Sequence, residues 1–78
     1  MSVHSYVLVQ CAVGQAAAVA ETVRALPGVI KAETVTGPYD VIVEVEAGTI
    51  DELGRLIIGQ LQQVPGITNN VTCPVVRL

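Results

Sequence analysis

The sequence has 78 residues, of which 51% are hydrophobic and 14% are charged, and its formal net charge is −3 at pH 7. A chain this short forms one domain and buries only about 60% of its unfolded surface, so disulfides, a metal or self-association usually support it. Two cysteines without CxxC spacing argue against a disulfide framework and a metal site, so oligomerisation remains as the support. The four basic residues are scattered, which excludes a nucleic-acid-binding face.

The beginning of the chain predicts neither export nor membrane insertion. Residues 1–4 carry no basic cluster and lead directly into strand-like sequence, unlike a signal peptide. No apolar run approaches the roughly 18 residues of a membrane span. Unpaired cysteines without an export signal are typical of a reducing compartment, so we expect a cytoplasmic protein.

Residues 6–13 predict a strand that is apolar on both faces, with Gln10 as the exception. A strand with one face in water would alternate more clearly, so we expect the helices to cover one face of the sheet and a second molecule the other. Residues 15–26 predict a helix, because apolar side chains recur at helical spacing. Pro27 and Gly28 end it.

Two further strands are predicted over residues 29–36 and 41–47, with a Gly-Pro turn between them. Glu44 and Glu46 lie on one face of the later strand. Paired carboxylates can bind a metal or exchange protons, but here we expect them to be solvated or to lie at the edge of a dimer interface.

The second helix is predicted to begin at a capping box, in which Thr49 supplies the cap hydroxyl and Glu52 follows three residues later. Gly54 and Gly59 each cost about 1 kcal/mol relative to alanine, so we expect them to allow close packing against the sheet or a neighbouring molecule. The helix is expected to continue to about residue 64, with a core stripe of Ile50, Leu53, Ile57, Leu61 and Val64 that Leu56 and Ile58 widen.

The last strand is predicted over residues 67–76, after a second Pro-Gly stop. Pro74 lies within this strand and has no main-chain N–H to donate, so we expect the strand at an edge of the sheet.

The chain nearly repeats itself. The pattern of residues 7–14 returns at residues 41–48, and that of residues 26–29 returns at residues 64–67. Each half therefore predicts a strand, a helix, a Pro-Gly stop and a second strand. Two such halves in succession form the split βαβ motif. We therefore predict one α+β domain over residues 1–78 with the ferredoxin-like βαββαβ fold. Its four-stranded antiparallel sheet has the order 4-1-3-2, with both helices on one face and dimerisation, as a dimeric α+β barrel, through the other.

Catalytic interpretations find little support. His4 lies near the N-terminus, where we expect a surface side chain without a catalytic partner. Cys11 sits among apolar strand residues and Cys73 lies on the predicted edge strand, and both are expected to be inert thiols. No Gly-rich phosphate loop is present. The sequence therefore predicts no enzyme, no metal site and no cofactor.

The segment from residue 34 to residue 40 has no counterpart in the other half of the chain. Main-chain N–H groups near Gly37 and Tyr39 suit a carboxylate, and Asp40 could hold an ammonium group. Tyr39 could cover an aliphatic side chain. Together these groups complement a zwitterionic amino acid. The alternative is a plain hairpin in which Asp40 caps its own turn.

The run Val35-Thr36-Gly37-Pro38-Tyr39-Asp40, followed by an apolar strand, resembles the V-T-G-x-Y-D signature of the Lrp/AsnC family's C-terminal effector domain, also called the RAM domain. The opening strand, both Pro-Gly turns and Thr72 also fit, so the resemblance covers essentially the whole chain. Full-length members carry an N-terminal helix-turn-helix domain that binds DNA. This sequence begins at the first strand of the effector domain and so resembles a stand-alone form.

The resemblance implies a function in amino-acid-dependent regulation of transcription, without DNA binding by this chain. It implies sheet-to-sheet dimers that assemble into octamers or decamers. A stand-alone form could co-assemble with a full-length regulator or bind a ligand for another purpose. Effector amino acids would bind between dimers, at the loop and at the start of the last strand of a neighbouring subunit. Residue by residue, the implied ligand-binding positions are Gly37, Tyr39, Asp40, Thr68, Asn70 and Thr72.

Three alternatives stay open. Small monooxygenases and isomerases share the dimeric α+β barrel, but they usually keep a pocket lined by histidine and aromatic residues, and this chain has one His, two Tyr and no Phe or Trp. ACT-like regulatory domains share the topology and the ligand class, but they bind at a Gly-containing first loop that is short here. A structural partner whose loop binds nothing is the third.

Overall fold

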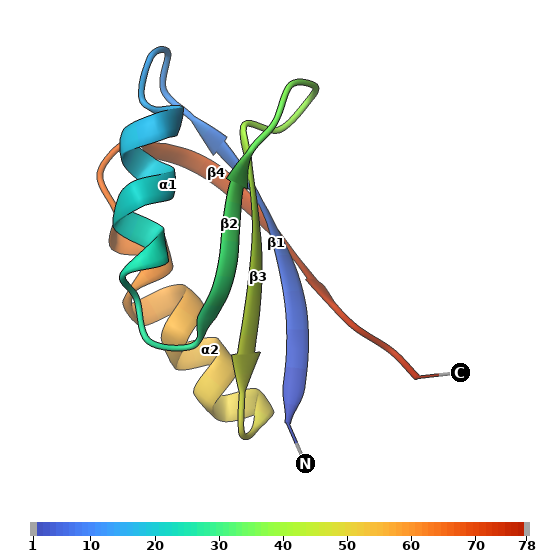
Figure 1. Cartoon of the computed structure of the whole chain (residues 1–78). Helices are drawn as coiled ribbons and strands as arrows, with labels where there is room; N and C mark the ends of the chain where they lie inside the picture. Colours follow the sequence, from blue (N-terminus) through green and yellow to red (C-terminus); the bar gives the residue numbers. More distant parts are fainter. Residues whose placement is uncertain (1, 78) are drawn as a thin grey trace.

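The computed structural model describes residues 2–77. Its elements, in chain order, are β1 (Val3–Cys11), α1 (Ala16–Arg24), β2 (Val29–Thr34), β3 (Val41–Ala47), α2 (Ile50–Gly59), the 3-10 helix η1 (Leu61–Gln63) and β4 (Ile67–Pro74). The strands of residues 2–77 form one antiparallel sheet of order β2-β3-β1-β4, and both helices cover the same face (Figure 1). Counted from the other edge, this is the predicted 4-1-3-2 order, so the ferredoxin-like fold is confirmed. Within the described residues, no helix has the length and apolar character that a membrane crossing requires.

The two halves of the chain repeat their contacts as well as their sequence. The N–H of Ala12 donates to the carbonyl of Gly66, and the N–H of Glu46 donates to the carbonyl of Gly28, both at 2.8 Å. The two glycines have φ of +89° at Gly28 and +97° at Gly66, a left-handed conformation that favours glycine. Each Pro-Gly turn therefore docks onto the central strand of the opposite half, which is why both halves need it.

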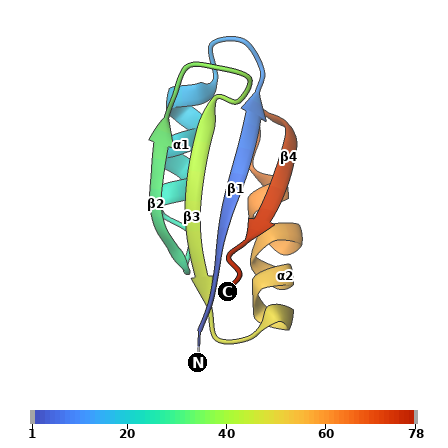
Figure 2. The same cartoon turned by 90° about the vertical axis from the view of Figure 1, so that its right-hand side faces the viewer.

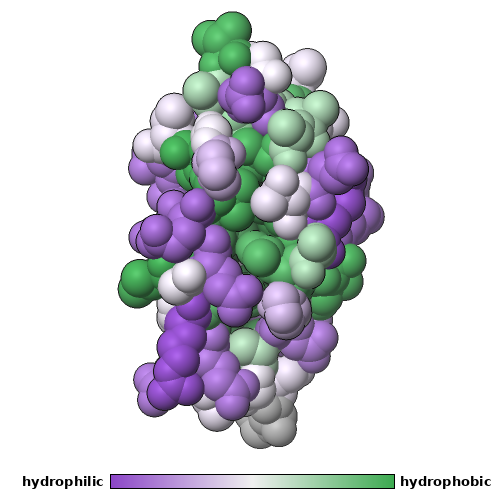
Figure 3. All heavy atoms as spheres, turned by 90° about the vertical axis from the view of Figure 1, so that its left-hand side faces the viewer, coloured by the Kyte–Doolittle hydropathy of each residue, from purple (hydrophilic) through white to green (hydrophobic). Residues whose placement is uncertain are grey.

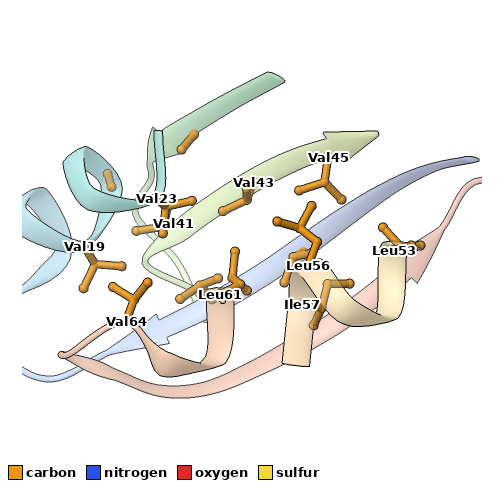
Figure 4. Close-up of a cluster of buried hydrophobic side chains, with 14 residues drawn as sticks. Val19, Val23, Val41, Val43, Val45, Leu53, Leu56, Ile57, Leu61 and Val64 are labelled. Carbon is orange, nitrogen blue, oxygen red and sulfur yellow. The ribbon is translucent and has the colours of Figure 1, made fainter. Parts of the chain in front are cut away.

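The core lies between the helices and the sheet (Figure 4). Fully burying one of its valine or leucine side chains stabilises the fold by about 1.5–3 kcal/mol. Its largest members with no more than 7% exposure are Val7, Val9, Val19, Val23, Val41, Val43, Val45, Leu53, Leu56, Ile57, Leu61 and Val64. Seen from the helix side, apolar atoms run down the middle of the molecule between polar flanks (Figure 3).

Helix α2 ends five residues before its predicted end at residue 64. Gln60 leaves the helical conformation at φ −127° and ψ −57°, and η1 follows with Leu61 at 0% exposure. Gly59 is a weak helix former, and the break lets Leu61 reach the core. Other boundaries shift by one to three residues. For example, β1 begins at Val3, because its first residues pair with the end of β3.

Two residues of the predicted core stripe are exposed. Ile50 is 61% exposed and Ile58 is 63% exposed, so their assignment to the core is wrong. Ile58 lies about 100° around the helix from the buried Ile57, and Ile50 lies in the first turn. Close packing of the sheet against Gly54 and Gly59 is also wrong, because a Cβ on either glycine would meet no atom of residues 2–77 within 4 Å outside its own stretch of helix, whereas packing against a neighbouring molecule stays a prediction.

The sheet face opposite the helices is open in the single chain (Figure 2). The register places Tyr6, Leu8, Ile42, Val71 and Cys73 on this open face, and Tyr6 is 44% exposed. It also carries an ion pair between Lys31 and Glu33 at 2.8 Å, and Nε2 of His4 lies 3.4 Å from a carboxylate oxygen of Glu46. Of the two coverings predicted for the sheet, the helices are confirmed and the second molecule stays a prediction.

Both edge strands interrupt their pairing with the sheet. Ile30 in β2 and Thr68 in β4 are extra residues at register shifts. The guanidinium Nε of Arg24 also donates to the main-chain carbonyl of Ala32 in β2 at 3.0 Å. Pro74 closes β4, which confirms the prediction that this strand lies at an edge.

Candidate functional site

The loop between β2 and β3 is a closed hairpin with an open tip. The N–H of Val35 donates to the carbonyl of Asp40 at 2.9 Å and closes its base. Gly37 at the tip has φ +139°, and a Cβ built there would meet no atom of residues 2–77 within 4 Å. In Figure 2 the loop arches over the top of β3 towards the end of β1. The predicted turn is therefore present, and its tip is free of packing within the described chain.

The loop tip presents main-chain donors. Among residues 2–77, the N–H groups of Gly37 and Tyr39 donate to no acceptor, and Pro38 between them has no N–H. Free main-chain N–H groups at a loop tip can donate to an anion such as a carboxylate. Both groups are thus available for the role predicted for Gly37 and Tyr39, which stays a prediction.

Asp40 ties the loop to β1 by two hydrogen bonds. Its N–H donates to the carbonyl of Val9 at 2.8 Å, and its Oδ2 accepts from the N–H of Cys11 at 2.7 Å. The carboxylate thereby replaces a main-chain acceptor where the pairing of β1 with β3 ends. The alternative in which Asp40 caps its own turn is wrong, because its side chain bonds to a residue 29 positions away. The other oxygen, Oδ1, accepts no hydrogen bond within residues 2–77 and keeps its acceptor capacity.

The predicted residues of β4 lie on the far side of β1 from the loop. Asn70 pairs with Val9 and Thr72 pairs with Val7, so both point towards the helix layer. Thr72 borders an apolar hollow of about 320 Å³ between α2 and β4, and the hydroxyl of Thr68 donates to the main-chain carbonyl of Gln10 at 3.2 Å. One chain therefore holds the six predicted residues in two groups separated by β1, and does not bring them together.

Gln10 joins these two groups, and it was missing from the predicted site. Its Nε2 donates to the carbonyl of Pro38 at 3.0 Å, and its Oε1 accepts from Nδ2 of Asn69 at 3.3 Å. The sequence carried a signal for it, because Gln10 is the polar exception in an otherwise apolar strand.

The Cys11 thiol offers little nucleophilic chemistry. Burial, with the negative charge of Asp40 nearby, raises the pKa of the Cys11 thiol above its ordinary value, so this thiol stays protonated at neutral pH. Cys73 is exposed at the other end of the sheet, and both cysteines are free. The disulfide between β1 and β4 that two cysteines allow is therefore not formed.

His4 lies between two carboxylates rather than alone on the surface. Its Nε2 is 3.4 Å from Glu46 and its Nδ1 is 3.8 Å from Glu44. A hydrogen bond from Ser2, with His4 nearby, lowers the pKa of Glu46. Within residues 2–77, no three side chains of the His, Cys, Asp and Glu types are placed to hold a metal ion.

The strand order and the layer of two helices define a small α+β domain of the ferredoxin-like class. Residues 4–78 match the family described as the Lrp/AsnC ligand binding domain, and the chain belongs to this family.

Among curated proteins, an uncharacterised HTH-type transcriptional regulator, PH1916 of Pyrococcus horikoshii, is 35% identical over 54 residues. The match covers 69% of this chain and 36% of that regulator, so the chain spans well under half of its curated relative. The crystal structure of hypothetical protein PHS023 from Pyrococcus horikoshii is 32% identical, with a TM-score of 0.90 over 97% of this chain and 92% of that one. Regulator NMB0573 of Neisseria meningitidis, solved as an L-Met complex, shares the fold at 17% identity, with a TM-score of 0.84 over 96% of this chain and 50% of that one.

Proposed function

We propose that this chain is a non-enzymatic regulatory module that binds a free amino acid and acts as an oligomer. The observation that carries the proposal is the tip of the 36–40 loop. It offers two free N–H groups and one free carboxylate oxygen, in a chain that belongs to a ligand-binding family.

The chemistry of the loop suits both ends of a zwitterion. The ligand's carboxylate accepts hydrogen bonds from the N–H groups of Gly37 and Tyr39, and its ammonium group donates to the free Oδ1 of Asp40. Charge-assisted hydrogen bonds of this kind are about twice as strong as neutral ones. The Tyr39 ring lies against the ligand's side chain. The L-Met complex of the related regulator supports an amino acid as the ligand class.

The site is completed by a second copy of the chain. Because β1 separates the loop from Thr68, Asn70 and Thr72 within one chain, these β4 residues reach the ligand from a neighbouring subunit. Dimers form through the open sheet face, where Tyr6 and Val71 are well exposed, and then assemble into octamers or decamers. Exposed apolar patches of this kind are typical of interaction surfaces.

The module regulates transcription through a partner rather than by binding DNA. Its four basic residues form no phosphate-binding face, and Arg24 and Lys31 already contact Ala32 and Glu33. The relative PH1916 is an HTH-type transcriptional regulator, and the match to this chain covers only 36% of its length. Co-assembly with such a regulator in the cytoplasm would couple amino-acid binding to DNA binding.

Titration calorimetry against the twenty amino acids tests the proposal, on protein whose assembly mass is measured by light scattering. We expect heat from one chemical class of amino acid. Asp40→Asn is the informative variant, because Asn keeps an acceptor for the Cys11 N–H and removes the charge that holds the ammonium group. Absence of heat from all twenty amino acids on the assembled protein would refute the proposal, and so would an unchanged affinity in Asp40→Asn.

A further inference from the structure

Gln10 is the polar residue of an otherwise apolar strand, and in the structure its side-chain amide makes two hydrogen bonds. It lies in β1 with its side chain on the open face, half-buried, opposite Asn69 of β4. Both ends of its amide are used: Nε2 donates to the carbonyl of Pro38 and Oε1 accepts from Asn69. These partners lie 28 and 59 positions away along the chain.

The chemistry of this position calls for an amide. A side chain that donates to one neighbour and accepts from another needs both functions at its end, and Gln provides both. Glu of the same length has no donor for the Pro38 carbonyl, and Leu has neither function. The two partners also fix the direction of the amide, because its nitrogen must face the loop and its oxygen must face β4.

The tip of the 36–40 loop depends on this contact. The base of the loop is held by Val35 and Asp40, but within the described chain the residues between them are hydrogen-bonded to the sheet only through the carbonyl of Pro38. Gly37 beside it has φ +139°, and a Cβ built there would meet no atom of residues 2–77 beyond its chain neighbours within 4 Å, so packing does not hold the tip in place. The direction of the Gly37 and Tyr39 N–H groups therefore follows from the position of Pro38.

We propose that Gln10 is a positioning residue that fixes the loop tip relative to the start of β4. Its main-chain carbonyl also accepts from the hydroxyl of Thr68, so the same residue contacts both segments of the proposed amino-acid site. This inference rests on the proposed function, and it adds the element that holds the site's donors in place before a ligand arrives. Preorganised donors bind more tightly, because less conformational freedom is lost on binding.

Fluorine NMR tests the inference in the ligand-free protein. The chain has two tyrosines, Tyr39 in the loop and Tyr6 on the open face of the same sheet, so 3-fluorotyrosine labelling gives a reporter and an internal control. In Gln10→Leu and Gln10→Glu, we expect the Tyr39 signal to shift and narrow while the Tyr6 signal stays unchanged. Asn69→Ser keeps the bond to Pro38 and is expected to perturb Tyr39 less than either Gln10 variant.

Calorimetry with the amino acid that the wild-type protein binds gives the second readout. Loss of one exposed hydrogen bond is expected to weaken binding about twofold to threefold in both Gln10 variants. A Tyr39 signal identical to wild type in Gln10→Leu overturns the inference, even if that variant is less stable. If the wild-type protein binds none of the twenty amino acids, the proposed function fails, while the fluorine signal still decides the role of Gln10.

Discussion

Replacing Asp40 by Ala removes the acceptor of a 2.7 Å hydrogen bond and leaves the Cys11 N–H without a partner in a partly buried position. An unpaired buried donor costs about 1–3 kcal/mol. Because this bond is short and its acceptor is charged, we expect Asp40→Ala to lower the free energy of unfolding by about 2 kcal/mol. Asp40→Asn keeps a neutral acceptor at the same place, so its expected loss is below about 1 kcal/mol.

These losses are large enough to measure. For a domain of this size, 1 kcal/mol corresponds to about 4–8 °C in melting temperature, so Asp40→Ala is expected to melt about 8–16 °C below the wild-type protein. Urea titrations followed by circular dichroism would give the free energies. Protein concentration must be held constant, because self-association contributes to apparent stability. The reasoning fails if Asp40→Ala matches the wild type within about 0.3 kcal/mol, or if Asp40→Asn loses as much as Asp40→Ala.

Three further changes probe the fold. Thr49→Ala removes the cap that the Glu52 N–H uses at 3.1 Å and is expected to cost about 1 kcal/mol in chemical denaturation, whereas Thr49→Ser should stay near the wild type. Leu61→Ala empties a fully buried site and is expected to cost about 2–5 kcal/mol, and a loss under about 1 kcal/mol would mean that η1 does not pack on the core. Because folding raises the pKa of the Cys11 thiol above its ordinary 9.0, the stability linked to this thiol is complete below about pH 9 and falls as pH rises. As the pH rises above 9, urea midpoints should therefore decline more steeply in the wild type than in Cys11→Ala, and parallel declines would contradict this assignment.

The fold was predictable where its causes are local. The first Pro-Gly stop follows α1 within three residues, and the Thr49 hydroxyl accepts from the N–H of Glu52 as the capping box predicts. The end of α2 was not predictable in this way. The apolar spacing continues through Leu61, so the pattern extends the helix, but the chain leaves it at Gln60 and the buried Leu61 belongs to the 3-10 helix η1.

In the candidate site, too, the residues of one loop were predictable and the contacts between strands were not. The types of residue in the loop, and its lack of a counterpart in the other half, pointed to Gly37, Tyr39 and Asp40 from the sequence. The partner of the Asp40 carboxylate did not follow, because it is the main chain of a residue in another strand. Gln10 was visible as an exception, but its meaning depends on two contacts that only the folded sheet creates. Whether the loop and β4 meet across subunits stays a prediction.

The interrupted edges of the sheet have a consequence for how copies of this chain meet. Proteins that present long, regular edge strands risk sideways growth into fibres, and bulges, proline and covering side chains reduce that risk. In β2, the extra residue Ile30 breaks the register and Arg24 donates a hydrogen bond to a main-chain carbonyl. In β4, the extra residue Thr68 breaks the register and Pro74 ends the strand. These interruptions protect the domain from unlimited strand addition, so the assemblies proposed above would form through the open sheet face and not through the strand edges.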